Sequence, residues 1–295
     1  MSKAFYPKMA LSNINKNRQT YFPYIITCIL TIMMYFMMGS ILHNENVRNM
    51  NHGDMVIVLL NIGMWVTMIF AVVFLFYTNS FLIKRRQKEI GLYNILGMEK
   101  RHIAKMMFYE TLFTAVVSIG IGMLMGMLFG KLMFLLLIKL IGSSEIPAFQ
   151  IPSEAVVNTL VTMALVFFAI LLYNLARIHL TKPIELIHGG QIGEKEPKTK
   201  ILLTIIGVLT MGAGYTFALT AKTTFQAMNN FLVAVILVIV GTYCLFTAGS
   251  IAFIKLLRKN KKFYYQTKHF TSVSGMLYRM KQNAVGLANI CILST

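Results

Sequence analysis

The sequence has little charge and very few acidic residues. Of its 295 residues, 13% are charged, and only 10 are Asp or Glu against 28 Lys or Arg, so the formal net charge is +18. A soluble domain carries about a quarter charged residues, whereas this chain is 57% hydrophobic and has a mean hydropathy of +0.66. This composition argues against a water-soluble enzyme.

The sequence also lacks the motifs of metal and nucleotide chemistry. The only Gly-Lys pair, at 130–131, has Met125 where a phosphate-binding loop needs its first glycine. We therefore predict no catalytic residues, no metal site and no bound cofactor in this chain. The three cysteines lie in apolar runs without the spacing of a metal site: Cys28, Cys244 and Cys291.

Long apolar runs are what the sequence has in abundance. Each would be about 30 Å or longer as a helix, which is the thickness of the hydrocarbon layer of a membrane. The predicted fold class is an all-α integral membrane protein with six complete transmembrane helices. The six runs, none with an ionisable residue near its centre, are Tyr21–Leu42, Met55–Thr78, Met106–Gly130, Ala155–Ala176, Ile201–Thr220 and Phe231–Ile254.

A seventh apolar run, 284–295, follows Lys281 and has only 12 residues. A span needs about 20. We interpret this run as the truncated start of a seventh span in a longer membrane protein.

The basic residues fall in alternate loops between the apolar runs. If the N-terminus is cytoplasmic, 24 of the 28 Lys and Arg lie on the inner side, and the outer side has no net charge. Cytoplasmic loops of membrane proteins retain Lys and Arg in this way. We therefore predict a multi-pass plasma-membrane protein with a cytoplasmic N-terminus. Nucleic acid is excluded as a partner because these charges lie in short loops against the membrane.

One basic run lies just after the sixth span, beside Tyr264 and Tyr265. It could contact anionic lipid or a partner protein, or it could be a solvated collar at the membrane surface. Its residues are Lys255, Arg258, Lys259, Lys261 and Lys262.

Small residues recur every four positions in the third run, where Ser118 precedes Gly122, Gly126 and Gly130. Such a stripe allows close contact between helices in lipid, within one subunit or at a dimer seam. Ordinary enrichment of glycine in membrane helices is the alternative explanation.

The cytoplasmic segment Phe81–Glu110 is basic at its start and then apolar. We predict a short interfacial helix that stops at Gly97, followed by a new helix from Glu99 into the membrane. Its residue pattern fits docking in a groove of a cytoplasmic partner and fits contact with anionic headgroups equally well. Three apolar residues fall on one side of this helix: Ile83, Ile90 and Tyr93.

Two motifs carry a resemblance to a known family. The heptapeptide Arg86-Gln-Lys-Glu-Ile-Gly-Leu, then Leu96-Gly97-Met98 and Glu110, resembles the cytoplasmic signature of FtsX-like ABC-transporter permeases. With the later segments 182–190 and 193–200, the chain is similar to the bacitracin-export subfamily, which protects Gram-positive bacteria from antimicrobial peptides. The resemblance covers essentially the whole chain.

The resemblance implies a permease of ten spans, with a large extracellular domain between the seventh and eighth. It also implies a separate ABC ATPase subunit, expected as a dimer, which binds the ATP. Coupling to that subunit would involve seven residues: Arg86, Glu89, Ile90, Gly91, Leu96, Gly97 and Glu99.

The function implied by the resemblance is resistance to peptide antibiotics such as bacitracin, through ATP-driven release of the peptide from lipid cell-wall precursors. A histidine kinase of a two-component system would be a further partner. The alternatives are a membrane sensor that moves no cargo, and an FtsX-like protein for lipoprotein release or control of a wall hydrolase.

The expected organisation follows from the runs and the resemblance. It comprises an N-terminal interfacial segment at 1–20, a four-span FtsX-like unit at 21–178 with its coupling loop at 80–106, a cytoplasmic loop at 179–200, two spans at 201–254, a basic cytoplasmic loop at 255–283 and the start of a seventh span at 284–295.

Overall fold

The computed structural model describes residues 5–48, 53–141, 150–180, 201–221, 224–259, 264 and 267–294. These residues are almost entirely helical, and none of them lies in a β-strand. They fall into two compact units, 1–191 and 192–295. The predicted all-α fold class is confirmed.

Six helices of the described residues are long and apolar enough to cross a membrane, and each coincides with one of the six apolar runs. The prediction of six complete spans is therefore confirmed. The spans are Arg18–Leu42, Gly53–Ile95, Lys100–Leu140, Ser153–His179, Ile201–Leu219 and Asn230–Lys259.

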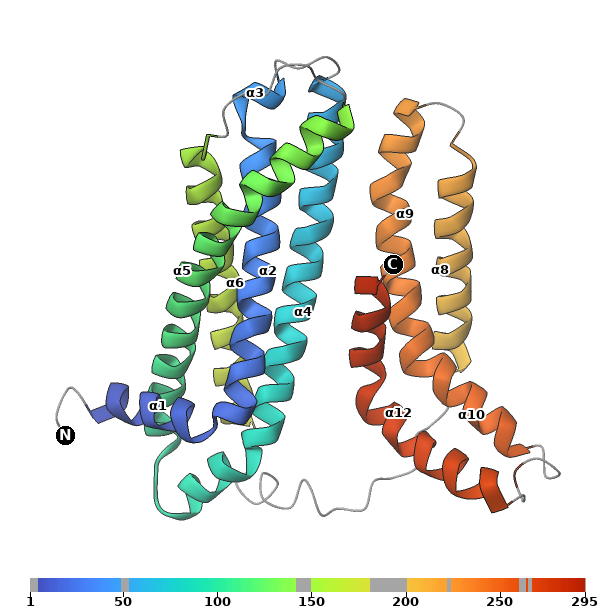
Figure 1. Ribbon diagram of the computed structural model, residues 1–295. Coiled ribbons are helices and arrows are strands. Elements are labelled where there is room, and N and C mark those ends of the chain that lie inside the picture. The colour runs from blue at the N-terminus through green and yellow to red at the C-terminus, as the bar shows by residue number, and fades with distance from the viewer. Residues whose placement is uncertain are drawn as a thin grey trace. The chain divides into compact units, whose positions relative to one another are not determined.

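The first unit is a bundle of four long helices with a short helix across its lower end (Figure 1). The long helices run along one another, and the N-terminal helix α1 lies across them near the cytoplasmic end of the predicted topology. The helices are α1 (Phe5–Lys16), α2 (Arg18–Leu42), α3 (Glu45–Arg48), α4 (Gly53–Ile95), α5 (Lys100–Ile141) and α6 (Ser153–Leu180).

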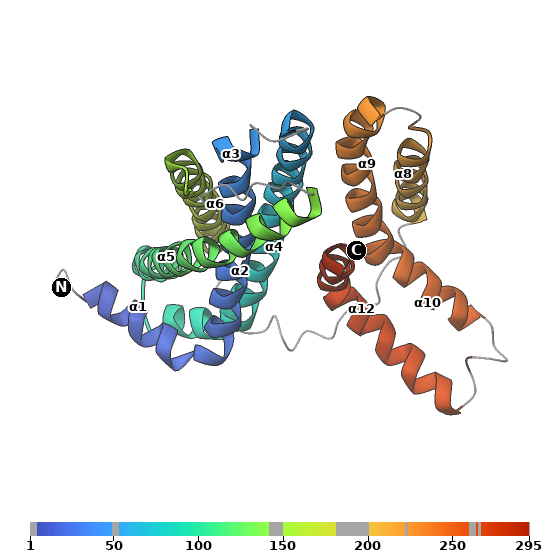
Figure 2. The ribbon, with the colours of Figure 1, turned by 45° about the horizontal axis from the view of Figure 1, so that its top comes forward.

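Helix α2 lies at the centre of this bundle and packs against α4, α5 and α6. Its side chains Cys28, Ile32 and Phe36 are fully buried and belong to one apolar cluster with Leu75 of α4 and Ile170 of α6. The upper part of α5 leans across α2, as Figure 2 shows from a second direction. The bundle is thus built around α2, so a displacement of α4 or α5 must also affect α2.

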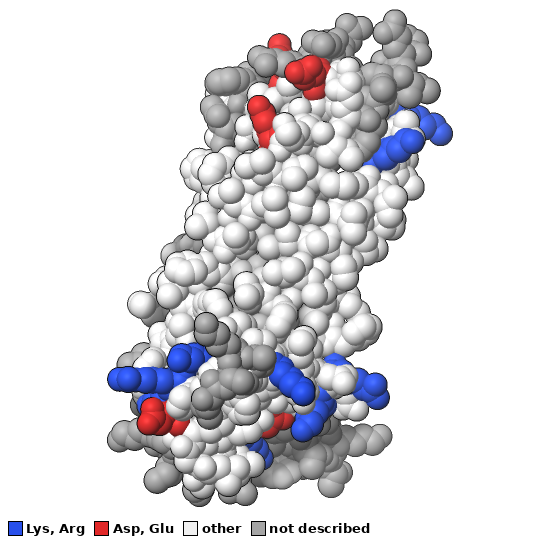
Figure 3. Space-filling model, turned by 90° about the vertical axis from the view of Figure 1, so that its left-hand side faces the viewer, with Lys and Arg blue, Asp and Glu red and all other residues white. Residues whose placement is uncertain are grey.

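Charged side chains lie at the two ends of the first unit. Figure 3 shows mainly Lys and Arg, with some acidic groups, at the lower end of one face, acidic and a few basic groups at the upper end, and a wide uncharged band between them. Such a band matches the hydrocarbon layer of a membrane, where exposed apolar side chains meet lipid tails. The exposed leucines of α5, such as Leu124 and Leu128, lie in its transmembrane run.

The second unit begins with the antiparallel pair α8 (Ile201–Leu219) and α9 (Thr224–Cys244). A π-helical stretch, Leu245–Gly249, continues α9 into α10 (Ser250–Lys259), which packs against α12 (Thr267–Ser294). Glycines make the α8–α9 contact close, since a Cβ on Gly241 would lie 2.9 Å from the backbone nitrogen of Met211. The sequence reasoning missed this contact, although Gly207 and Gly214 are spaced seven residues apart, as two helix turns require.

The region 255–283 differs from the predicted basic loop, because its described residues are mostly helical. Helix α10 runs to Lys259, and α12 begins at Thr267 and includes the predicted seventh run from 284 onward. The two helices pair because they bury Ile251, Ile254 and Val273 against each other. The predicted cytoplasmic loop 179–200 lies almost wholly outside the described residues.

The C-terminal end of α4 also differs from expectation. In place of a separate short interfacial helix, residues 81–95 continue α4 without a break, so α4 has 43 residues. Continuation buries Ile83 and Ile90 against Ile103 and Met106 at the start of α5. This burial gives the extension a packed face, which an isolated short helix would lack.

Candidate functional site

The turn between α4 and α5 begins where Gly97 ends the helix. Gly97 has a φ of +92°, a conformation that glycine adopts without steric cost. The N–H of Gly97 donates to the Asn94 carbonyl (3.2 Å) and the N–H of Met98 to the Tyr93 carbonyl (2.9 Å). These are the two hydrogen bonds of a Schellman motif, with Met98 and Tyr93 as its apolar pair. The predicted stop at Gly97 is therefore present, and α5 starts at Lys100.

An ion pair joins α4 to α5 just above this turn. Arg86 donates from Nη1 to Glu110 Oε2 at 2.6 Å and from Nη2 to Glu110 Oε1 at 3.0 Å. Arg86 is 2% exposed and Glu110 is 3% exposed. Two parallel bonds of this kind are the strong, geometrically specific mode of an Arg–carboxylate pair. The pair therefore fixes the axial register of α4 against α5.

Side chains from α1 and α2 complete the coordination of this ion pair. Tyr21 of α2 donates to Glu110 Oε2 at 2.9 Å and accepts a hydrogen bond from Arg86. Asn13 of α1 donates to Glu110 Oε1 at 3.1 Å, and both side chains are buried. A buried ion pair is tolerated when its remaining polar atoms are hydrogen-bonded, and these two side chains provide such bonds.

A second carboxylate extends the network toward the surface. Asn17, between α1 and α2, donates to Glu89 Oε2 at 2.9 Å, and Arg86 Nε lies 3.4 Å from the same oxygen. We call Asn13, Asn17, Tyr21, Arg86, Glu89 and Glu110 the Arg86 network. It connects four helices, α1, α2, α4 and α5, at the end of the bundle where α1 lies.

Beyond the network, the α4–α5 turn exposes a group of apolar residues. Leu96 is 72% exposed and Ile95 is 61% exposed, and Leu92 is exposed one turn earlier. Gly97 and Glu99 are exposed beside them. We call these five residues the α4–α5 tip. Clustered apolar side chains at a surface are typical of a protein-binding site.

The seven predicted coupling residues thus fall into two groups. Arg86, Ile90 and Gly91 are buried and Glu89 is partly buried, so they hold the helix ends together. Leu96, Gly97 and Glu99 are exposed at the tip and are accessible to another protein. Arg86, with 2% exposure, has no surface to offer a partner.

The structure brings the predicted glycine stripe against α2. A Cβ on Gly122 would lie 2.9 Å from Ile32 Cβ and 3.0 Å from the Ile29 carbonyl oxygen, and one on Gly126 would lie 2.7 Å from Phe36 Cδ1. Real Cβ contacts of this kind are longer than 3.0 Å. The α2–α5 approach at these two positions therefore depends on glycine. Gly130 is buried one turn further along.

The predicted basic collar is only partly described. Arg258 and Lys259 are exposed at the end of α10, and Lys255 is half-buried. The guanidinium of Arg258 lies 5.9 Å from the centre of the Tyr264 ring. Lys261 and Lys262 lie outside the described residues.

Three buried polar residues of this region were missed by sequence reasoning: Asn13, Tyr21 and Asn79. Asn79 of α4 and Asn174 of α6 exchange two amide hydrogen bonds, at 2.7 and 3.1 Å. A cavity of about 10 Å³ between this pair and Glu110 has room for about one water molecule. The sequence offers only a weak signal for these residues, because single Asn and Tyr residues near span ends are common. Glu110 gives a clearer signal, since it is the one acid inside an apolar run.

The comparisons with known proteins agree with this architecture. Residues 61–182, from within α4 to the end of α6, match the family described as FtsX-like permease C-terminal. An uncharacterized ABC transporter permease of Bacillus subtilis, YvcS, is 30% identical over 94% of this chain and 43% of its own length. The bacitracin export permease protein BceB of Halalkalibacterium halodurans is 28% identical over 97% of this chain and 46% of its own length.

A further relative, the ABC transporter permease protein YxdM of Bacillus subtilis, is 25% identical over 94% of this chain and 44% of its own length. The chain therefore spans less than half the length of the curated relatives it matches.

Proposed function

Because this chain carries an FtsX-like permease domain and is homologous to ABC transporter permeases, we propose that it is the membrane subunit of an ABC transporter whose α4–α5 tip binds a separate ATPase subunit. The permease itself is a transport component and not an enzyme. One observation carries the proposal: the tip presents exposed apolar residues, and the same helix carries the buried Arg86 of the network a few residues earlier.

This arrangement suits the transmission of force from a cytoplasmic ATPase. An ATPase that shifts the tip would pull on α4 and α5 together, because the Arg86–Glu110 pair joins them. The hydrogen bonds from Asn13 and Tyr21 carry that displacement to α1 and α2. Since α4 is continuous from the tip through its span, its transmembrane part moves as one body with the tip. Rigid elements of this kind produce a discrete rearrangement of packed helices.

Leu96→Asp is expected to weaken binding of the ATPase subunit at least thirtyfold, because an exposed anchor side chain at an interface contributes about 2 kcal/mol or more. The fold should be unaffected, since Leu96 is 72% exposed. Co-purification and surface binding of the ATPase to the full-length permease measure this effect.

The matched control for this variant is Leu11→Asp. Leu11 is an exposed leucine on α1, at the same end of the bundle, and its replacement should leave ATPase binding within twofold of wild type. Equal losses in both variants, or undiminished binding in Leu96→Asp, would contradict the assignment of the tip.

We propose a cytoplasmic N-terminus, on the strength of the distribution of Lys and Arg. In a variant without native cysteines, Glu99→Cys should be protected from a membrane-impermeant maleimide in intact cells, and Gln150→Cys should be labelled. Both residues are exposed. Glu99 lies in the α4–α5 tip, whereas the Gln150 carbonyl accepts a hydrogen bond from Asn44, just beyond the opposite end of α2. The reverse labelling pattern would overturn the orientation.

The relatives named as bacitracin export permeases support a finer proposal, that the whole protein counters peptide antibiotics. We further propose, from the resemblance of the cytoplasmic motifs, that ATP drives release of the peptide from lipid cell-wall precursors and that the permease signals to a histidine kinase. A resistance assay with a panel of peptides, using the full-length chain with and without its ATPase, tests this. Resistance should require both subunits. If removal of the permease abolished kinase output but left resistance unchanged, the result would favour a sensor that moves no cargo.

A further inference from the structure

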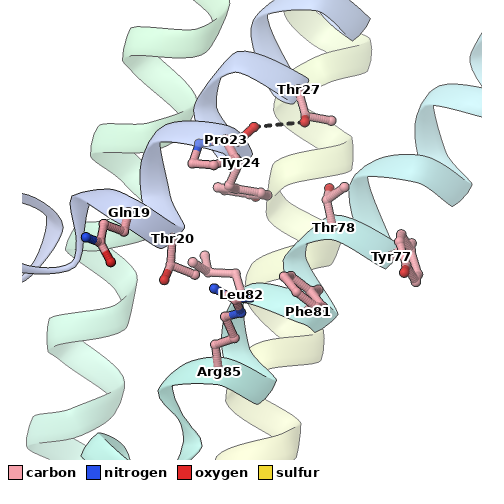
Figure 4. Close-up of a pocket in the computed structure, with 10 residues that line it drawn as sticks. All are labelled: Gln19, Thr20, Pro23, Tyr24, Thr27, Tyr77, Thr78, Phe81, Leu82 and Arg85. Carbon is pink, nitrogen blue, oxygen red and sulfur yellow. Dashed lines mark hydrogen bonds between the residues drawn. The ribbon is translucent and has the colours of Figure 1, made fainter. Parts of the chain in front are cut away.

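A cleft of about 300 Å³ lies between α2 and α4, and no residue of the Arg86 network lines it (Figure 4). Five of its lining residues come from α2 and five from α4. It lies where the apolar run of α4, Met55–Thr78, gives way to the basic segment that follows. This is the level at which the lipid headgroups of the cytoplasmic leaflet are expected under the proposed topology.

The charge of the cleft lies at one of its ends, since Arg85 is the only charged residue that lines it. Figure 4 shows Arg85, Gln19 and Thr20 toward its lower end, with Pro23 and Tyr24 above them. Phe81 is 46% exposed on the α4 side. The one charged side chain of the lining therefore lies at the end expected to face the cytoplasm, and the rest of the lining is uncharged, which suits an anionic headgroup at that end and the start of an acyl chain beside it.

The guanidinium of Arg85 is available to bind an anion. It lies over the Phe81 ring, 4.9 Å from the ring centre, which holds it at the mouth of the cleft. In the part of the chain that the structure describes, both ion pairs belong to its neighbour Arg86, and no acidic side chain pairs with Arg85. Arg85 is exposed, so a phosphate can reach it without displacing a carboxylate.

We propose that the α2–α4 cleft binds one anionic phospholipid of the cytoplasmic leaflet. Its phosphate lies beside Arg85 and Thr20, and the first part of an acyl chain lies against Pro23 and Phe81. The cleft volume is at the lower end of the range for small-ligand sites, which fits a headgroup and the adjoining chain segment. The bound lipid would fill the space between α2 and α4 next to the helices that the Arg86 network connects.

Photo-crosslinking tests this site directly. The full-length permease with its ATPase is placed in phosphatidylcholine vesicles that contain a trace of diazirine-labelled phosphatidylglycerol, or of labelled phosphatidylcholine as the comparison. Mass spectrometry then measures adducts in the peptides that contain residues 19–27 and 77–85. We expect more adduct from phosphatidylglycerol, and Arg85→Gln should lower that adduct about fivefold, the effect of one basic residue at a membrane surface.

Two further variants separate a specific site from diffuse attraction. Lys84→Gln removes the same charge from an exposed neighbour that does not line the cleft, and it should leave the adduct unchanged within twofold. Thr78→Phe fills the cleft and should lower the adducts of both lipids. Equal losses in Arg85→Gln and Lys84→Gln would overturn the proposal. So would equal adduct yields from the two lipids, or the absence of adducts in these peptides because a protein segment fills the cleft.

Discussion

Glu110→Gln is expected to destabilise the permease by about 3–5 kcal/mol, because it leaves the buried guanidinium of Arg86 without its carboxylate. The glutamine keeps the shape of the side chain and can still accept a hydrogen bond from Tyr21 or Asn13, so the loss reports the charge and not the volume. Thermal unfolding of the purified full-length permease, with and without bound ATPase, measures the effect.

Two further variants keep this prediction testable. Glu99→Gln makes the same chemical change at an exposed position in the same turn, and its unfolding midpoint should match that of wild type. Arg86→Met combined with Glu110→Met removes both charges, and apolar replacement of a buried pair is often close to neutral. The double variant should therefore be more stable than either single variant. A double variant as unstable as the sum of the two would contradict the ion-pair explanation.

The double variant also separates stability from coupling. If the Arg86 network transmits movement from the tip, the double variant should bind the ATPase through Leu96 and yet lose transport or peptide resistance. A folded double variant with full resistance would limit the network to a structural role.

Gly126→Leu is expected to separate α5 from α2 and to destabilise the bundle by about 1–3 kcal/mol or more, the usual range for overpacking. A Cβ at this position would already lie 2.7 Å from Phe36 Cδ1 and 3.3 Å from the Met33 carbonyl oxygen, and the backbone oxygen cannot rotate away. Because α2 lies at the centre of the first unit, the effect should appear as reduced yield and a lower unfolding temperature in detergent.

Gly120→Leu is the matched control for that variant. Gly120 lies on the same helix, is exposed, and a Cβ there would meet nothing within 4 Å. Its replacement should preserve yield and peptide resistance, since an added leucine at this position faces only the lipid. Normal stability in Gly126→Leu would mean that the stripe reflects ordinary glycine enrichment in membrane helices.

Much of the fold follows from local features of the sequence. The six spans are predicted by run length and the absence of central charge, since each helix in lipid must be long and apolar by itself. The stop at Gly97 is likewise local, because a positive φ favours glycine whatever surrounds it. Sequence reasoning was less successful at the helical extension to Ile95, which depends on the burial of Ile83 and Ile90 against α5, on the other side of the turn.

The site shows the same division. The resemblance singled out Arg86 and Leu96 together, but it could not separate a buried residue from an exposed one. Asn13 and Tyr21 had no signal of their own, because their importance comes from meeting Glu110 across 97 and 89 positions of the sequence. Contacts of that separation depend on how α1 and α2 pack against α5.

The sequence by itself determined that the protein resides in a membrane, how many apolar spans it has and how its charges are distributed between the loops. These properties depend only on composition and on the order of residues along the chain. Only the tertiary structure decided the roles of the adjacent arginines 85 and 86. Neighbouring residues on a helix point about 100° apart, so packing buries Arg86 against Glu110 and leaves Arg85 at the mouth of the α2–α4 cleft. No local property distinguishes these two side chains. Their roles differ because α5 packs against only one side of α4.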